Sequence, residues 1–270
     1  MGLLKVENAA FAYGKKVVFE NINFTLQEGE MFCLLGPNGS GKTTLLDSIL
    51  GLSKLHTGTV WLNKVQMNGL KPMEIAKKMA YVPQMQQRTF PYRVIDMVLM
   101  GRTAYTSTFS SPTDEDLHMA AKALSLVGME GFKECIYTNL SGGEGQLVMI
   151  ARALTQDAAL IIMDEPTAHL DFKHEMMILE KIVQLVKERK KSILMATHFP
   201  NHALYFENNG LPTKVAMLKD RHIVAAGAPS KVLSEKTMEE VYGIQSKILS
   251  YDGLREQVYQ YVIPLKTCSQ

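Results

Sequence analysis

The residues best suited to chemistry lie in a glycine-rich loop near the N-terminus. Residues 36–43 fit the pattern G-x-x-x-x-G-K-[ST], in which backbone N–H groups surround phosphate oxygens. An apolar run, Met31 to Leu35, precedes the loop, and a helix-compatible stretch from Lys42 to Leu52 follows it. We therefore expect Lys42 to reach the β- and γ-phosphates of a nucleotide and Thr43 to place its hydroxyl on Mg²⁺. The alternative is an ordinary Gly/Ser turn, which this strand–loop–helix context disfavours.

Two carboxylates follow another apolar run. Asp164 and Glu165 come directly after Leu160 to Met163, so both leave the end of a water-poor strand. Phosphoryl transfer asks a protein mainly for positioning and charge stabilisation. We expect Asp164 to hold Mg²⁺ through water and Glu165 to polarise the water that attacks the γ-phosphate. The alternative is a pair of strand-end carboxylates in surface salt bridges.

Two adjacent glycines mark a third feature, residues 141–144. Read locally, Ser141 is the N-cap of a helix and Glu144 closes a capping box. Adjacent glycines lower the stability of a helix start, which indicates that something approaches the backbone closely there. A helix N-terminus favours anions, yet residues 36–43 already bind this chain's nucleotide. We infer that Ser141 and Gly143 face the γ-phosphate bound by a second copy of the chain.

With these motifs the chain resembles the ATPase subunits of ABC transporters over nearly its whole length. Residues 36–43 resemble the Walker A motif, 160–165 the Walker B motif with its catalytic glutamate, and 140–146 (Leu-Ser-Gly-Gly-Glu-Gly-Gln) the signature. Gln84, in Tyr-Val-Pro-Gln, resembles the Q-loop glutamine, and residues 168–171 (Ala-His-Leu-Asp) resemble the D-loop.

The resemblance implies a role for each matched residue. His198 resembles the switch histidine that contacts the γ-phosphate, although the residues alone favour a histidine satisfied in the core. Tyr13 is placed like the aromatic residue that stacks on adenine, and Gln84 would connect the γ-phosphate to a docking surface. The implied catalytic residues are Glu165, His198, Lys42 and Gln84, and the implied Mg²⁺ ligands are Thr43, Gln84 and Asp164. The implied ATP-binding residues are Tyr13, Gly36, Pro37, Asn38, Gly39, Ser40, Gly41, Lys42, Thr43, Thr44, Ser141, Gly142, Gly143 and Asp171.

The resemblance also implies partners. Two chains would form a head-to-tail sandwich, with each of two ATP molecules held between the Walker A motif of one chain and the signature of the other. Integral membrane permease subunits would be bound directly, and a periplasmic or lipid-anchored substrate-binding protein indirectly, without nucleic acid. Such a chain lies peripherally on the cytoplasmic face of the cell membrane.

Some positions depart from the usual family pattern. Gly145 stands where Arg, Lys or Gln is frequent, and we expect it to weaken helix packing or interface contacts. His169 stands where Ala or Asn is usual, a feature that resembles the ATPases of metal-chelate importers. Those importers carry iron–siderophore complexes, haem, cobalamin or oxyanions such as molybdate. Further segments that resemble these ATPases are 100–102, 201–203, 227–233 and 241–243.

Periodic patterns predict the elements that must position the motifs. Residues 22–27 alternate apolar and polar side chains, as expected of a half-buried antiparallel strand. The apolar runs 160–163 and 193–196 predict buried parallel strands, and the segment between them fits the crossover helix. Residues 114–127 predict a helix. A hairpin is predicted from 215–218 and 222–226, with a final segment of helix and strands after Gly227 and Pro229.

The predicted fold class is α/β: a P-loop NTPase core with an N-terminal antiparallel β subdomain and an inserted helical subdomain, as in ABC ATPases. We place the core at 1–84 and 150–227 and the helical signature subdomain at 85–149. The C-terminal tail then covers 228–270.

Composition narrows the class of protein. The chain has 270 residues, 46% of them hydrophobic, and a formal net charge of +2, which suits a globular protein and argues against affinity based on nucleic-acid phosphates. Its three cysteines, Cys33, Cys135 and Cys268, are far apart, so neither a disulfide framework nor a zinc pattern is expected. No apolar run approaches the length of a membrane span or of a secretion signal.

Two further hypotheses stay open. An ABC-type ATPase acting on DNA or the ribosome is one, although no long heptad run and only one phosphate loop are present. A small-molecule kinase is the other, disfavoured by the signature and by His198. The aromatic residues of the helical lobe predict either a docking cleft for a membrane subunit or the core of that lobe. They are Phe90, Tyr92, Tyr105 and Phe109.

Overall fold

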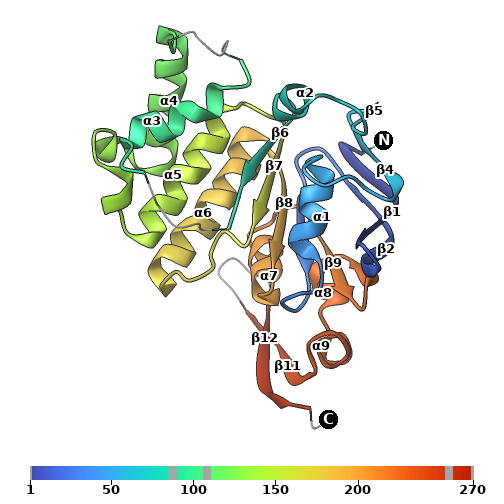
Figure 1. Cartoon of the computed structure of the whole chain (residues 1–270). Helices are drawn as coiled ribbons and strands as arrows, with labels where there is room; N and C mark the ends of the chain where they lie inside the picture. The colour runs from blue at the N-terminus through green and yellow to red at the C-terminus, as the bar shows by residue number, and fades with distance from the viewer. Residues whose placement is uncertain (1, 85–89, 106–110, 253–257, 269–270) are drawn as a thin grey trace. The chain divides into compact units, whose positions relative to one another are not determined.

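The structure is a computed structural model that describes residues 2–84, 90–105, 111–252 and 258–268. The chain folds as two compact units (Figure 1). The first unit joins Met1–Gly69 to Leu185–Gln270, and the second is Leu70–Gln184. The phosphate loop therefore belongs to the first unit and the signature to the second. The predicted class, mixed α/β with an antiparallel sheet and a helical region, is confirmed.

An antiparallel sheet opens the first unit. It contains β1 (Leu4–Tyr13), β2 (Lys16–Leu26), β4 (Thr57–Leu62) and β5 (Val65–Gln66), in the order β2-β1-β4-β5. The predicted strand at 22–27 is the second half of β2, where buried and exposed or half-buried residues alternate. Phe19 and Ile22 are fully buried on its inner face. One face of this sheet therefore contributes to the core of the first unit.

Parallel strands carry the phosphate loop in the same unit. β3 (Met31–Leu35) is buried along its whole length and pairs in parallel with β8 (Ser192–Thr197) and β9 (Thr213–Lys219). The unbroken apolar pattern of β3 arises because both of its faces are covered. The loop after β3 leads into α1 (Lys42–Ile49), which is shorter than the stretch to Leu52 predicted from the sequence.

The predicted hairpin is present as β9 and β10 (His222–Gly227). Its two-residue turn, Asp220 and Arg221, has φ of 45° and 74°, which is the left-handed pair that a tight antiparallel hairpin requires. The order of these strands in the first unit is β10-β9-β3-β8.

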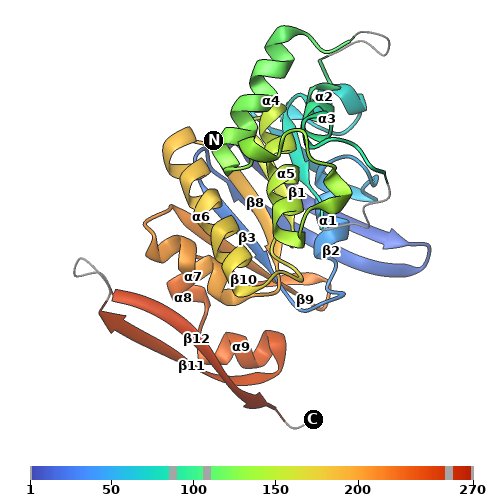
Figure 2. The same cartoon turned by 90° about the vertical axis from the view of Figure 1, so that its left-hand side faces the viewer.

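The predicted helix and strands of the C-terminal segment are also present. They are α8 (Pro229–Val232), α9 (Glu235–Tyr242), β11 (Ile244–Asp252) and β12 (Val258–Thr267). The β11–β12 hairpin lies beside α7 (Pro200–Asn208) and α9 (Figure 2). The Asn201 amide bonds both the N–H and the carbonyl of Val262, at 2.8 and 3.0 Å. Asn208 bonds Gln260 in the same way, so α7 supplies hydrogen bonds along β12 as a neighbouring strand would.

The second unit contains a parallel strand pair. β6 (Met79–Val82) pairs with β7 (Leu160–Asp164), and the register places Val82 opposite Met163. Two helices accompany the pair in sequence: α2 (Pro72–Ala76) precedes β6, and α6 (Phe172–Arg189) follows β7 at the position predicted for the crossover helix.

Between β6 and β7 the described residues form mainly helices. These are α3 (Val94–Leu99), α4 (Asp114–Val127) and α5 (Gly142–Thr155), joined by three short 3₁₀ helices, η1 (Met100–Arg102), η2 (Glu130–Phe132) and η3 (Tyr137–Asn139). The bounds of α4 match the prediction, because Thr113 caps its start and Gly128, with φ of 77°, closes its end. Helices α3, α4 and α5 pack on one another (Figure 1). Among the residues that the structure describes, no helix has the length and apolar character needed to cross a bilayer.

Candidate functional site

The phosphate loop is shaped by glycines that no other residue could replace without strain. Gly36 has φ of 156°, and a Cβ there would lie 2.4 Å from the Leu218 carbonyl oxygen. Gly41, the N-cap of α1, has φ of 101°, and its Cβ would lie 2.9 Å from a methyl carbon of Val18. Backbone conformation and lack of space therefore both require glycine at these positions.

Two polar side chains lie inside the loop. The Lys42 side chain is buried, and its ammonium donates to the carbonyls of Gly36 and Pro37 at 2.9 and 3.1 Å. The Ser40 hydroxyl oxygen is buried and has no hydrogen-bond partner among the described residues. A buried hydroxyl without a partner is costly, so a ligand that bonds it is favoured.

The other loop residues surround these groups. Asn38, Gly39 and Thr43 are exposed, and Thr44 is half-buried. On the antiparallel sheet of the same unit, the Tyr13 side chain is 60% exposed, and its ring meets Phe11 edge to face with centroids 4.9 Å apart. An exposed ring held by a neighbouring ring can stack on a planar base.

His198 lies directly after β8, which is the carboxyl end of a buried parallel strand. It is half-buried, and its ring centroid is 3.9 Å from that of Phe199. His202, in contrast, is buried and bonds the Thr197 hydroxyl through Nδ1 at 3.1 Å. The satisfied core histidine of this segment is therefore His202, and His198 is the more accessible of the two.

The second unit holds the carboxylates. Asp164 ends β7 and is buried, while Glu165 follows in the left-handed region with φ of 43° and is half-buried. Gln84 is exposed two residues beyond β6. Because β6 and β7 are parallel neighbours, Gln84 and Glu165 leave at the same edge of the pair. Glu165 adopts a backbone conformation that is rare for a non-glycine residue, as is frequent at functional sites.

The predicted capping box at the signature is confirmed. The Glu144 carboxylate accepts from the Ser141 N–H and hydroxyl, each at 2.7 Å, and the Ser141 hydroxyl oxygen accepts from the Glu144 N–H at 3.4 Å. Ser141 is exposed, Gly142 is half-buried and Gly143 is buried. Unlike the loop glycines, neither Gly142 nor Gly143 has positive φ. Gly145 is buried in the first turn of α5.

The carboxylate of Asp171, in the segment that resembles the D-loop, has a partner outside the predicted motifs. Asp171 accepts from the His174 backbone N–H at 2.9 Å, and its other oxygen lies 2.8 Å from His174 Nδ1. These two bonds, the backbone one first, hold the pKa of Asp171 below its usual range. The spacing of an acid and a potential partner three residues apart at a helix start is the signal that could have found this pair.

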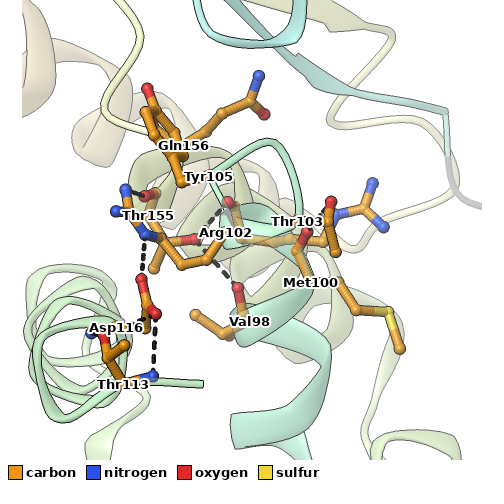
Figure 3. A network of polar contacts seen from close by, with 10 residues as sticks. Val98, Met100, Arg102, Thr103, Tyr105, Thr113, Asp116, Thr155 and Gln156 are labelled. Carbon is orange, nitrogen blue, oxygen red and sulfur yellow. Dashed lines mark hydrogen bonds and ion pairs between the residues drawn. The ribbon is translucent and has the colours of Figure 1, made fainter. Parts of the chain in front are cut away.

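A polar network that the sequence did not predict joins α3, α4 and α5 (Figure 3). Arg102 donates to Asp116 through Nε at 2.7 Å and to the Thr155 carbonyl at 3.0 Å, and its guanidinium lies 4.2 Å from the centre of the Tyr105 ring. The Tyr105 hydroxyl donates to the Gln156 carbonyl at 3.0 Å. The bond from Arg102, followed by bonds from Thr113, lowers the pKa of Asp116 to about 2.

Comparison with known sequences places the chain beside ATP-binding subunits. The profile of the ABC transporter family matches residues 19–168. An uncharacterised ABC transporter ATP-binding protein of Haemophilus influenzae is 38% identical over 92% of each chain. The iron(3+)-hydroxamate import ATP-binding protein FhuC of Bacillus subtilis is 33% identical, over 93% of this chain and 91% of its own.

Comparison with solved structures agrees. A chain of an ABC transporter described as metal-chelate type, in an inward-facing conformation, matches with a TM-score of 0.85 and 28% identity over 98% of both chains. A dimeric ATP-binding cassette in a post-hydrolysis state with ADP and Pi matches with a TM-score of 0.70 and 28% identity, over 84% of this chain and 98% of its own. Sequence and fold thus lead to the same family.

Proposed function

The chain belongs to the ABC transporter family of ATP-binding, ATP-hydrolysing subunits, and we propose that it works as a head-to-tail homodimer that powers uptake of a metal chelate. The dimer is proposed because the chain has two helix N-termini suited to bind phosphate. These are the start of α1 in the first unit and the start of α5 in the second. The phosphate loop before α1 surrounds a nucleotide held by one chain. The N-terminus of α5, with exposed Ser141, is then available to the γ-phosphate held by a second chain.

The residues of the loop fit ATP. The buried Ser40 hydroxyl gains a partner when a phosphate oxygen is bound, and the Lys42 ammonium, now on two carbonyls, is the cation that reaches the β- and γ-phosphates. The exposed Tyr13 ring stacks on adenine. The remaining contacts to the triphosphate come from other residues of the loop and the start of α1: Gly36, Pro37, Asn38, Gly39, Gly41 and Thr44.

Mg²⁺ also fits the donor set. Thr43, Gln84 and Asp164 offer a hydroxyl, an amide oxygen and a carboxylate, which are the hard oxygen ligands that this ion prefers. When bound, Mg²⁺ neutralises charge that develops on the phosphate oxygens.

Glu165 and His198 are the groups we assign to turnover. Glu165 accepts the proton of the attacking water, and His198 contacts the γ-phosphate. Glu165→Gln keeps the shape of the side chain but removes its basicity, so we expect hydrolysis to fall by about a hundredfold or more. A steady-state phosphate-release assay measures this fall, with Glu180→Gln on the exposed face of α6 as the matched control. Rapid hydrolysis by the Glu165 variant would overturn its role as the base.

Transport requires separate membrane subunits, which we place against the helical lobe from the cytoplasmic side. Tyr105 is partly committed to the network of Figure 3, whereas Phe90 and Tyr92 are 65% and 44% exposed, with ring centroids 6.0 Å apart. We therefore propose that Phe90 and Tyr92 contact a permease subunit. Phe109, the fourth aromatic residue of the predicted cleft, lies outside the described residues.

The cargo is inferred from the relatives. An iron(3+)-hydroxamate import subunit and a metal-chelate type transporter are both similar over most of the chain. We infer the same class, an iron–siderophore or related metal chelate, delivered by a substrate-binding protein to the permease.

Affinity purification from membranes solubilised in detergent tests the transport assignment. We expect the chain to retain an integral membrane protein, and Tyr92→Ala to reduce both this retention and chelate uptake while ATP binding persists. Equal transport by this variant would contradict the docking assignment. Retention of nucleic acid or ribosomes in place of a membrane protein would favour the alternative class of ABC ATPase.

A further inference from the structure

His174 lies between two motif residues of the second unit. It sits in the first turn of α6, and its side chain is 25% exposed. One side of the imidazole faces Asp171 of the D-loop, and the other faces Gly143 of the signature. No motif includes His174, yet it contacts two of them.

The contact with Asp171 uses both oxygens of the carboxylate. One oxygen accepts from the His174 backbone N–H at 2.9 Å, and the other lies 2.8 Å from Nδ1. The imidazole carries the proton of the second bond, because a carboxylate only accepts. This pair fixes the orientation of the ring.

The contact with Gly143 depends on the absence of a side chain there. A Cβ at Gly143 would lie 2.2 Å from His174 Cδ2, 2.4 Å from Cγ and 2.6 Å from Cβ. The φ of Gly143 is not positive, so its backbone conformation alone does not demand glycine. Glycine is needed because the imidazole packs directly on the backbone of the signature turn.

We propose that His174 is a positioning residue that fixes the signature turn to the D-loop. Gly142 and Gly143 form the first turn of α5, where glycine leaves the backbone free to fray. The ring restricts that freedom by packing against the turn, and Asp171 holds the ring in place. The exposed Ser141 and the N–H groups beside it are thereby kept in one arrangement.

This role has a consequence that rests on the proposed function, in which the signature of one chain completes the ATP site of another. A preordered turn binds a partner's phosphate without a further loss of backbone entropy. Loss of His174 should therefore weaken ATP-dependent dimerisation and turnover. Binding of ATP by the chain's own phosphate loop, in the other unit, should be unchanged.

Hydrogen exchange of the isolated chain without nucleotide tests the positioning directly. In His174→Ala, amides of the peptide covering residues 142–145 should exchange about tenfold faster, the loss expected when two glycines at a helix start lose their support. Peptides covering the phosphate loop should be unchanged. His118→Ala, which removes an exposed histidine of α4, is the matched control. Unchanged exchange at 142–145 in His174→Ala would overturn the proposal.

A second variant separates the two contacts. His174→Phe keeps a ring over Gly143 but loses the bond to Asp171, so it should retain part of the protection that Ala loses. If the amides of residues 142–145 exchange equally fast in His174→Phe and His174→Ala, packing of a ring on Gly143 does not order the signature turn, and the proposal fails.

Measurement of ATP hydrolysis tests whether His174 also matters for function. At saturating ATP, kcat of His174→Ala should fall about tenfold, in step with the exchange effect. The Kd for ADP, which is not hydrolysed and lacks the γ-phosphate proposed to contact the signature, should stay within about twofold. A kcat equal to that of the parent chain, with altered exchange, would refute a role in catalysis. If the parent chain itself hydrolyses no ATP, the proposed function fails, and the exchange result still decides whether His174 orders the turn.

Discussion

The phosphate loop and the signature turn are both glycine-rich helix starts, yet they use glycine for different reasons. In the phosphate loop, Gly36, Gly39 and Gly41 have positive φ, so glycine provides a backbone path that other residues rarely adopt. In the signature, Gly142 and Gly143 have no positive φ, and Gly143 leaves room for the ring of His174. The phosphate loop thus needs glycine for its backbone conformation as well as for space, whereas the signature needs Gly143 for space alone.

The phosphate loop and the signature also differ in the polar groups that each offers to a nucleotide. The phosphate loop contains a buried hydroxyl, that of Ser40, and the ammonium of Lys42, so it has groups of its own that can bond phosphate oxygens. The signature offers a capped helix start and an exposed serine, without a cation among its seven residues. A single chain should therefore bind ATP through the first motif, and the second should act only on a nucleotide that is already bound.

The largest effect is expected from Lys42→Ala in the phosphate loop. Removal of the cation that we propose to reach the β- and γ-phosphates should lower kcat/KM by about a hundredfold or more. Binding of a fluorescent ATP analogue to the isolated chain should weaken as well. Lys247→Ala, at an exposed position of β11 in the same unit, is the control. Retained binding and turnover would mean that the loop is not the nucleotide site.

The backbone explanation of the loop glycines can be tested by a matched pair. Gly36→Ala meets both an unfavourable φ and the Leu218 carbonyl, so we expect it to reduce the free energy of unfolding by about 3 kcal/mol. Gly39→Ala also meets a positive φ, of 79°, but nothing lies within 4 Å of the new carbon, so this change should cost about 1 kcal/mol. Urea denaturation measures both. Equal losses would show that space, as distinct from conformation, is unimportant at Gly36.

The packing explanation of the signature glycine predicts coupling between two residues. Gly143→Ala alone should destabilise the chain because the new carbon overlaps the imidazole. In the His174→Gly background the overlap is gone, because the His174 Cβ, 2.6 Å from the new carbon, is removed with the ring. Alanine is the better helix former, so the same change should then be neutral or stabilising. We expect an interaction free energy of about 1–2 kcal/mol from a double-mutant cycle in urea. Additive effects would contradict direct packing.

The smallest effect concerns the network that holds α3, α4 and α5 together, and it appears only in acid. The pKa of Asp116 is lowered to about 2 in the folded chain, below its value of about 3.9 in an unfolded chain. The stability from this carboxylate is therefore fully present above about pH 4 and is lost as the pH falls towards 2. Asp116→Asn should be less stable than the parent at pH 7, and the difference should shrink below pH 4. Urea midpoints across this range test it, and a difference independent of pH would contradict the ion pair.

Local chemistry in the sequence predicted the motifs and most elements. The bounds of α4 follow from Thr113 and Gly128, and β3 follows from its unbroken apolar run between a turn and the phosphate loop. The end of α1 was missed because Gly51, with φ of 73°, stops the helix before Leu52, whose apolar side chain fits the helical period.

Contacts between residues far apart in the sequence could not be predicted in this way. His174 packs on Gly143, and Arg102 pairs with Asp116 across the helical lobe, only because tertiary structure brings these helices together. Periodicity reports which face of a helix is buried, but it does not report the residue that lies opposite. The different roles of the loop and signature glycines are likewise not encoded locally, because φ and the space around a missing Cβ are properties of the folded chain.

Sedimentation of Glu165→Gln with Mg²⁺ and ATP tests the central claim, that the signature of one chain completes the nucleotide site of another. We expect a dimer with ATP and a monomer without it. Adding Ser141→Asp should abolish the dimer, because Asp keeps the helix cap but repels the phosphate, whereas Ser141→Asn, a neutral cap, should retain it in part. Loss of the dimer only with Asp is the result we predict, and a dimer that survives Ser141→Asp, or never forms with ATP, would contradict the claim.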